Sequence, residues 1–404
     1  MSAPARSPNS PPDIASLITA QGGELSTKLQ KHRLDLFPPD ARKPLRQFQP
    51  NEVARILGLN PGYLRNLSLE GKGPVATTTP SGRRSYSAEQ ILELRQYLDE
   101  NTRAGRRYLP HRRLGEKVQI VAVANFKGGS GKTTTAAHLV QHLALAGHRV
   151  LAIDLDPQAS LSAIHGMQPE FDVGDNESLY GAIRYDAHRR PMKEIIRQTN
   201  FPGLDIIPAN LELTEFEYDT PRALAKGEGG MTAHKFYSSF NQAIDQVADQ
   251  YDIVVFDSAP TLNYLTMAAL CAATGLLITV HPQMLDIMSM CQFLIMLGNT
   301  MTDLRDNGAA LQYDWVRYLI TRYDPQDGPQ IDMTTFIRSH FGRHVVANPM
   351  LKSTAISDAA LTKQTLYEVD RRQMTSSTYD RAMESLTAVN VEIETLIHRT
   401  WGRA

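Results

Sequence analysis

A glycine-rich stretch near the middle of the chain has the residue types needed to hold phosphate groups. It follows an apolar run, 118–125, and reads Lys127-Gly128-Gly129-Ser130-Gly131-Lys132-Thr133-Thr134. Glycines let backbone N–H groups approach phosphate oxygens, and the N-terminus of a following helix adds a favourable dipole. In such a loop Lys132 reaches the β- and γ-phosphates, and the Thr133 hydroxyl binds Mg²⁺. The residues from Gly128 to Thr134 therefore predict a site for ATP with magnesium, the alternative being a glycine turn with an incidental lysine.

The loop departs from the common P-loop pattern in an informative way. Glycine usually stands six positions before the second lysine, but Phe126 takes that place, and Lys127 precedes the glycine pair. A second ammonium offers more positive charge to a developing phosphoryl transition state. This pattern is the deviant Walker A motif, and with it the chain resembles the ParA- and MinD-like ATPases. The resemblance implies an ATP-sandwich homodimer in which Lys127 acts on the phosphates held by the other subunit; a lysine that only lies on the surface is the alternative.

Two acidic segments stand at the ends of predicted strands. Asp154-Leu155-Asp156-Pro157-Gln158 follows one apolar run, and Asp257 ends the run 253–256 in the manner of a Walker B strand. Carboxyl ends of parallel strands meet at one edge of the sheet, where open α/β sheets bind ligands. Asp257 would bind Mg²⁺ through water. The resemblance implies that Asp156 positions the attacking water and that Asp154 supports the Mg²⁺ shell. The alternative is that these carboxylates only cap the helix that follows.

Two later segments are assigned by the same resemblance. Asn348-Pro349-Met350 resembles the short proline loop that contacts adenine in these ATPases. Lys352 follows it at a place where a basic residue often meets DNA in the family, although arginine is more frequent there. The methionine-rich stretch 284–301 is interpreted as a core helix or a dimer helix.

The order of elements predicts the fold of the C-terminal part. Apolar runs alternate with helical patterns, and a helix is expected over 132–146, ending at Gly147. Continuous apolar strands between helices are typical of a parallel sheet that is covered on both faces. The expected strands are 118–125, 149–154, 253–256, 276–280 and 315–320. We therefore predict an α/β P-loop NTPase domain with a mostly parallel sheet over 118–404.

A different pattern precedes this domain. Residues 50–57 and 61–69 read as two helices joined by a three-residue turn, with Asn60 as cap and Pro61 at the first helical position. The pattern is that of a helix-turn-helix followed by a wing, and it resembles the winged helix-turn-helix of MerR-type regulators. We predict a winged helix-turn-helix DNA-binding domain over 46–100, closed by a helix from Ala88. Its candidate DNA-binding residues are Tyr63, Arg65 and Asn66 on the second helix and Arg83 and Arg84 in the wing after Pro80-Ser81-Gly82.

The remaining segments are less specific. Residues 1–45 are interpreted as a flexible tail, 1–12, and a dimerisation helix over 14–36. Gly22 and Gly23 interrupt the helical pattern, so a helix pair and a single helix that packs on a partner chain both stay open. Residues 101–117 are expected to form a basic linker, with arginines that could contact phosphates beside the wing.

Composition narrows the classes of protein further. Residues 1–117 hold 19 Lys and Arg against 11 Asp and Glu, whereas the remainder carries a balance of −9. A basic first part favours a polyanionic partner such as DNA. Two cysteines cannot build a disulfide framework or a four-cysteine metal site. No uninterrupted apolar run approaches the roughly 20 residues that span a bilayer, and Met1 to Pro12 has no signal-peptide core. A cytoplasmic protein without a membrane partner is expected.

The whole order of segments resembles that of long plasmid-partition ATPases of the ParA type, most closely the RepA group of RepABC plasmids. The resemblance implies a homodimer that binds ATP and Mg²⁺, coats DNA non-specifically at the nucleoid and segregates plasmids. It further implies weak hydrolysis stimulated by a ParB-like centromere-binding partner, and repression of its own replication and partition operon through operator-specific binding. An ATP-sensing transcriptional repressor is the alternative. A MinD-like membrane ATPase would need a C-terminal amphipathic anchor, and an iron–sulfur carrier would need paired cysteines.

Overall fold

The computed structural model describes residues 13–36, 43, 45–78, 82–101, 108–226, 233–309 and 311–403. Two units, Met1–Lys43 and Pro44–Ala404, are distinguished and are described separately. The expected tail, 1–12, lies outside the described residues.

Among its described residues, the first unit contains one helix, α1, Ile14–Leu36. It runs without a break through Gly22 and Gly23, where the sequence pattern indicates an interruption. Each glycine costs a helix only about 1 kcal/mol relative to alanine, so two of them within 23 residues do not end it. Ile14, Ile18 and Leu25 are exposed by more than half. Dimerisation through α1 stays a prediction.

A mostly parallel sheet organises the second unit. In the described part of the chain, seven strands lie in the order β5-β6-β4-β7-β3-β8-β9, and only β5 runs antiparallel to its neighbour. The predicted α/β P-loop NTPase fold with a mostly parallel sheet is confirmed. The strands are β3 Gln119–Ala124, β4 Val150–Asp154, β5 Arg197–Gln198, β6 Leu204–Ile207, β7 Ile253–Asp257, β8 Gly275–Val280 and β9 Trp315–Ile320.

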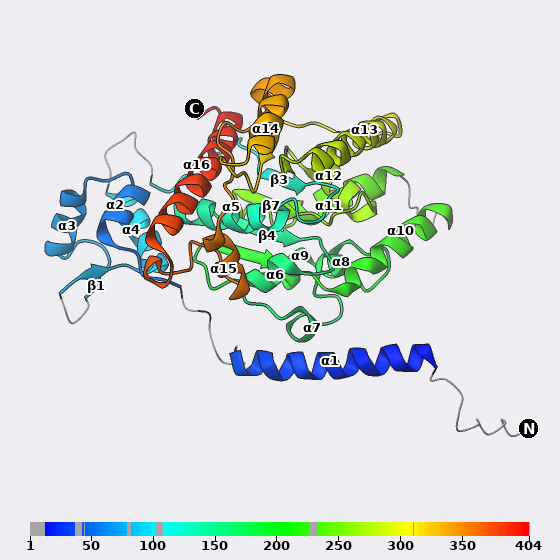
Figure 1. Cartoon of the computed structure of the whole chain (residues 1–404), viewed down its shortest axis with the longest axis horizontal. Helices are drawn as coiled ribbons and strands as arrows, with labels where there is room; N and C mark the ends of the chain where they lie inside the picture. Colours follow the sequence, from blue (N-terminus) through cyan, green and yellow to red (C-terminus); the bar gives the residue numbers. More distant parts are fainter. Residues whose placement is uncertain are drawn as a thin grey trace, which may run out of the picture. The chain divides into compact units, whose positions relative to one another are not determined.

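Helices cover both faces of this sheet (Figure 1). From Ile120 onward, the side chains of β3 point alternately to the two faces and are apolar on both. Val121 and Val123 lie in one hydrophobic core, and Ile120 and Ala122 lie in the other. The first core lies under α5 Lys132–Ala146, α15 Thr354–Leu361 and α16 Ser376–Thr400. The second lies under α8 Leu179–Ile183, α10 Glu215–Lys226, α11 Ala233–Asp245, α12 Tyr264–Ala272 and α13 Met284–Asp306. Shorter helices are α6 Ser160–Ile164, α7 Pro169–Asp172 and α9 Met192–Ile195, while α14 spans Gly328–Phe341.

Helix α13 is long and apolar enough, by length and composition alone, to cross a membrane. One face of it is nevertheless committed to the protein core, because Ile287, Met290 and Phe293 are buried. Leu285 and Ile295 are exposed by 74% and 66%. Apolar side chains therefore lie on both the buried and the outer face of this helix, and an exposed apolar face is typical of a surface that meets a partner.

The part of the second unit that precedes the sheet contains α2 Pro50–Ile56, α3 Pro61–Leu69, β1 Thr77–Thr78, β2 Arg84–Ser85 and α4 Ala88–Glu100. Asn60 caps α3 by accepting from the backbone N–H of Gly62 at 2.8 Å, and Ser87 and Gln90 form a capping box on α4. The tip of the β1–β2 hairpin, 79–81, with Pro80 and Ser81, lies outside the described residues.

This N-terminal part shares its hydrophobic core with the sheet region. The buried Arg95 of α4 donates to the carbonyls of Leu145 at the end of α5, Tyr108 and Ile56, at 2.8, 2.9 and 3.0 Å. Because this one buried guanidinium donates to three carbonyls, it holds α2, the connector and the end of α5 in fixed positions around α4. The two parts therefore do not have separate cores.

The connector is ordered over 108–117. Arg112 donates to the carbonyls of Tyr251 and Glu116, each at 3.0 Å, and to that of Ala248. Arg403 near the C-terminus donates to Pro110 O at 2.8 Å. The linker arginines are expected from the sequence to contact phosphates. The guanidinium of Arg112 instead donates to backbone carbonyls of its own chain. The expected basic residues 103, 106 and 107 lie outside the described residues.

Candidate nucleotide-binding site

The glycine loop between β3 and α5 is held by the two strands beside it. Thr279 of β8 donates its hydroxyl to Ser130 Oγ at 3.0 Å, and Thr321 after β9 donates to Ser130 O at 2.7 Å. Gly131 adopts φ 86°, where a side chain is strained, and a Cβ there would meet Thr321 at 3.4 Å. The loop is thus fixed in an open turn with α5 beginning directly at Lys132.

Two supporting residues carry no motif that predicts their role. Asn125 follows β3, accepts from the backbone N–H of Lys127 at 3.0 Å and donates to Thr279 O. Arg322 has φ 53° and donates to Gly129 O at 3.1 Å. A polar residue at the end of an apolar strand is the available signal for Asn125, whereas Arg322 has none because it is distant in sequence.

Lys132 lies at the centre of the loop. Its side chain is only 7% exposed, and Nζ donates to Lys127 O at 3.2 Å. Burial lowers the pKa of the ammonium, while the carboxylates of Asp257 and Asp156 oppose this shift. The lysine and the two acids therefore meet at one point, although the sequence separates them by up to 125 positions.

Asp154 and Asp257 end neighbouring strands and are register partners across β4 and β7. Burial raises the pKa of Asp154 to about 6, against hydrogen bonds from Ser162 N and Oγ at 2.9 and 2.7 Å. Burial, followed by the charge of Asp154, raises the pKa of Asp257 well above its usual range, while the Thr133 hydroxyl opposes the rise. Among the described residues, neither carboxylate oxygen of Asp257 has a hydrogen-bond partner of normal geometry.

These residues fit a magnesium ion. Two buried carboxylates side by side repel each other, and a divalent cation removes that repulsion. Oxygen donors from a carboxylate and a hydroxyl, here Asp257 and Thr133, are the ligands that Mg²⁺ prefers. The unpartnered oxygens of Asp257 are the observation that supports this fit.

Asp156 lies just beyond β4, on the loop side of the acid pair. Its backbone N–H donates to Asp154 Oδ1 at 3.2 Å, and its own Oδ1 accepts from Gln158 N at 2.9 Å. The side chain is half-buried, and its charge reaches Lys132. A carboxylate so placed can orient a water molecule at the edge of the loop.

Lys127 points away from the loop that carries it. Its Nζ forms an ion pair with Asp286 Oδ2 at 2.9 Å, and His281 Nδ1 lies 3.8 Å from the same oxygen. Burial lowers the pKa of His281, and the cations of Arg322, Lys127 and Lys352 add to this effect. The carboxylate of Asp286 opposes this shift, so His281 lies within reach of both the acid and the cations.

The segment Asn348-Pro349-Met350 runs beside the end of β9. Met350 N donates to Ile320 O at 2.8 Å, and Asn348 Nδ2 donates to Glu392 Oε2 at 3.3 Å. The Met350 side chain is 3% exposed and belongs to the core. The groups of this segment that stay accessible are Asn348 and, in part, Pro349.

Comparison with known proteins identifies the family of this chain. The AAA domain family matches residues 118–307. A protein named as a replication protein A from Sinorhizobium fredii (strain NBRC 101917 / NGR234) is 58% identical, covering 99% of this chain and 98% of its own. Protein SopA of Escherichia coli (strain K12) is 30% identical, covering 88% of this chain and 90% of its own. The chain belongs to the ParA/SopA family of partition ATPases.

Solved structures show the same fold at lower identity. A partition protein matches with a TM-score of 0.66 at 18% identity, covering 95% of this chain and 99% of its own. A variant of McdA from Cyanothece, solved as an ATP complex, matches with a TM-score of 0.55 at 18% identity, covering 72% of this chain and 98% of its own.

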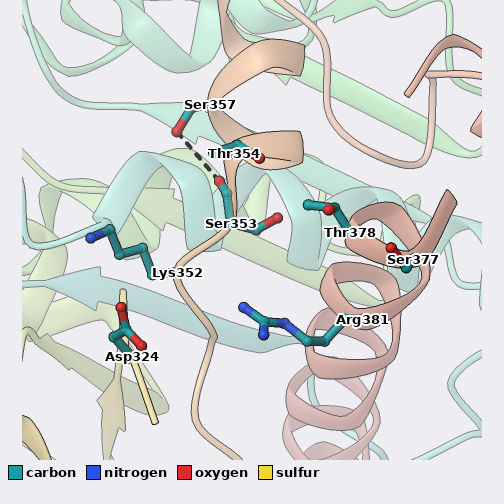
Figure 2. A pocket seen from close by; sticks show the side chains of 8 residues that line it. All are labelled: Asp324, Lys352, Ser353, Thr354, Ser357, Ser377, Thr378 and Arg381. Atoms are coloured by element: carbon teal, nitrogen blue, oxygen red, sulfur yellow. Dashed lines mark hydrogen bonds between the residues drawn. The ribbon is translucent and has the colours of Figure 1, made fainter. Parts of the chain in front are cut away.

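A concave site with none of the nucleotide-loop residues in its lining contains the predicted Lys352. A cavity of about 440 Å³ is lined by Asp324, Lys352, Ser353, Thr354, Ser357, Ser377, Thr378 and Arg381. Figure 2 shows Arg381 extending from α16 toward the segment that carries Lys352 and Ser353. Thr354 begins α15, and Ser377 lies in the first turn of α16, so two helix N-termini face this cavity. Cations, hydroxyls and helix N-termini are the groups that bind phosphate.

The candidate DNA-binding residues of the N-terminal part are placed on its surface, with one exception. Tyr63, Arg65 and Asn66 are exposed on α3. Arg84 is half-buried and donates to Ser68 Oγ of α3 at 3.1 Å, so it ties β2 to the helix. Arg83 is exposed beside it.

Proposed function

We propose that this protein is a plasmid-partition ATPase that hydrolyses ATP to ADP and phosphate, weakly by itself and faster with a ParB-like centromere-binding partner. ATP and Mg²⁺ would hold a homodimer that binds DNA non-specifically, at the nucleoid in the cytoplasm. The observation that carries the proposal is the interaction of Lys132 with the carboxylate of Asp257, the register partner of the buried Asp154, in a loop that bears a second lysine, Lys127.

Each residue of the site has a distinct role in this proposal. Backbone N–H groups of Gly128 to Thr134 and the Lys132 ammonium bind the phosphates. Thr133, with Asp257 and Asp154 behind it, holds Mg²⁺, which when bound neutralises charge on the phosphate oxygens. Asp156 orients the water that attacks, and Lys127 of each subunit stabilises charge in the site of the other.

The ion pair of Lys127 supports a role in the dimer. In the single chain Lys127 is paired with Asp286 at 2.9 Å, so the nucleotide loop is incomplete without a further cation. The apolar outer face of α13 begins at Met284, next to this pair, and Met284 and Met288 are each 57% exposed. Burial of such a face against a second copy would accompany the delivery of Lys127.

Two surfaces are proposed to meet DNA. The cavity with Lys352 and Arg381 would accept a backbone phosphate, which requires no particular sequence. The pair α2 and α3 would act as a winged helix-turn-helix, with Tyr63, Arg65 and Asn66 facing an operator in the protein's own operon. The second activity makes the protein an autorepressor.

An ATP-sensing transcriptional repressor without a transport role is the second candidate. The buried hydrogen bond from Arg95 Nε to Leu145 O, at 2.8 Å, favours it, because this bond joins the predicted DNA-binding part to the helix that starts at the P-loop. Such a connection lets nucleotide state bias operator binding.

The experiment that separates these functions is gel-shift binding to random DNA and to DNA from the upstream region of the operon. Each is measured without nucleotide, with ADP and with ATP, at one fixed salt concentration. A partition ATPase binds random DNA only with ATP. Binding to the operator alone, with no ATP-dependent binding to random DNA, would favour the repressor.

A further inference from the structure

Three histidines surround one glutamate at the contact between α5 and α16. Nε2 of His142 lies 3.1 Å from Oε2 of Glu394, and Nε2 of His148 lies 3.0 Å from Oε1. Nε2 of His398 lies 3.9 Å from that same Oε1. This cluster is separate from the nucleotide-binding residues and from the predicted DNA-binding residues.

We propose that His148, Glu394 and His398 form a binding site for a transition-metal ion of the Zn²⁺ class, with His142 as the residue that orients the carboxylate. Imidazole and carboxylate groups are the donors that Zn²⁺ takes in sites of two histidines and one glutamate. A bound ion would link the C-terminal helix α16 to the end of α5.

The arrangement of the elements brings the ligands together. Glu394 and His398 are four residues apart on α16, so both side chains lie on one face of the helix. His148 follows Gly147, whose φ of 99° ends α5 and turns the chain back toward α16. One ligand atom from each of the three residues lies within 4.8 Å of the other two.

The distances suit a tetrahedral ion after a small adjustment. Zn–N and Zn–O bonds of about 2.0–2.2 Å place ligand atoms roughly 3.3 Å apart. The pair His148 and Glu394 is already at 3.0 Å, and His398 must approach Glu394 from 3.9 Å. The His398 side chain is 27% exposed, so neighbouring residues do not enclose it on every side and it can turn toward Glu394.

One potential ligand atom of the cluster, in the described part of the chain, is left without a hydrogen-bond partner. Within the described residues, Nε2 of His398 is buried and has no hydrogen-bond partner.

The surroundings also set the strength of the site. Ligating histidines usually donate their second N–H to an acceptor, and loss of that partner weakens metal binding by about 10–100-fold. Nδ1 of His148 has no hydrogen-bond partner in the part of the chain that the structure describes. The site is therefore an exchangeable one, in which protons compete with the metal.

Trp401 provides a direct reporter. Its ring lies 6.0 Å from that of His148 and 5.9 Å from that of His398, between centroids. The experiment titrates the EDTA-treated, tag-free full-length protein with Co²⁺ and then with Zn²⁺, without nucleotide. Excess Mg²⁺ is present to occupy the carboxylate site, and the visible absorption of Co²⁺ and its quenching of tryptophan fluorescence are recorded.

The wild type is expected to bind one equivalent of Co²⁺ that Zn²⁺ displaces, and Zn²⁺ should raise its midpoint of thermal unfolding. His398→Gln and Glu394→Gln should each bind Co²⁺ at least about tenfold more weakly. His340→Gln, on an exposed histidine of α14, is the matched control and should bind as the wild type does. Circular dichroism verifies the fold of each variant, and the wild-type titration stands even where Glu394→Gln does not fold. Absence of a Co²⁺ spectrum in the wild type, or equal binding by His398→Gln, would overturn the proposal.

Discussion

Nζ of Lys127 lies 2.9 Å from Oδ2 of Asp286, the third residue of α13. The lysine that distinguishes this loop from a common P-loop is therefore paired within its own chain. Lys127 is 39% exposed and Asp286 is 11% exposed, so the pair is partly solvated. Such ion pairs contribute about 0.2–1 kcal/mol to stability. A phosphate in the partner's site can bind Lys127 more strongly than this and so replace Asp286 when the dimer forms.

We expect Asp286→Asn to free Lys127 for the partner's site. Loss of an opposing pair of about 1 kcal/mol predicts up to roughly fivefold higher ATP turnover at protein concentrations where dimerisation limits the rate. Phosphate release across a protein dilution series measures this, and Asp303→Asn, an exposed residue of the same helix, is the control. Turnover that is unchanged or lower at every dilution would contradict a restraining role for Asp286.

The two central residues of the site should fail in different ways. Lys132→Ala removes charged hydrogen bonds worth about 1.5–3 kcal/mol each and should abolish binding of a fluorescent ATP analogue. Asp156→Ala should bind the analogue as the wild type does, while hydrolysis falls at least about 100-fold because the attacking water is no longer oriented. Equal hydrolysis by the wild type and Asp156→Ala would refute the role assigned to Asp156.

The cavity residues Lys352 and Arg381 should contribute to non-specific DNA binding in the ATP state. Removing one cation that binds a phosphate lowers the slope of log K against log salt by about 0.9. Affinity of Lys352→Ala and Arg381→Ala for random DNA is measured at several salt concentrations, with Arg305→Ala, at the far end of α13, as control. A salt slope unchanged in both cavity variants would exclude phosphate binding there.

Asp252 predicts a pH-dependent contribution to stability. This buried carboxylate accepts from His111 Nδ1 at 2.9 Å and from Arg149 Nη2 at 2.8 Å, and these bonds hold its pKa well below the usual range despite burial. Because the folded-state pKa is depressed, the stabilisation is present above the unfolded value of about 3.9 and is lost as pH falls below it.

Asp252→Asn should therefore lower the free energy of unfolding by about 1.5–3 kcal/mol at pH 7, the contribution of a hydrogen bond to a charged group, because Arg149 is 39% exposed and solvent weakens the ion pair. Urea unfolding at several pH values should show this gap narrowing below about pH 4. The exposed Asp249→Asn serves as the neighbouring control. If the difference in free energy of unfolding between the wild type and Asp252→Asn stays constant down to the lowest pH, the negative charge of Asp252 does not contribute to stability.

The fold and the centre of the site could be predicted because their signals are local. The strand that ends in Asp257 is a continuous apolar run, and the loop at Lys132 combines glycines with a helix start, so neither depends on distant residues. Alternation of such segments is sufficient to place the acids and the loop at one edge of the sheet.

The supporting contacts could not be predicted because they join positions far apart in the chain. Asp286 is 159 residues from Lys127, and Thr321 is 191 residues from Ser130. Neither residue type at those positions carries a motif. The same reason applies to the ordered connector, where Arg112 reaches carbonyls near residue 250 that no pattern in the sequence associates with it.

The action of Lys127 across the dimer is tested most directly by mixing two inactive variants, Lys127→Gln and Asp156→Ala, with ATP, Mg²⁺ and random DNA. In a mixed dimer, the site of the Lys127→Gln subunit keeps its own Asp156 and receives Lys127 from the other subunit. The account predicts recovery of about a quarter of wild-type hydrolysis, since half of randomly formed dimers are mixed and each has one complete site. No recovery, after subunit exchange has been verified by labelled subunits, would show that Lys127 acts within its own chain and would contradict the account.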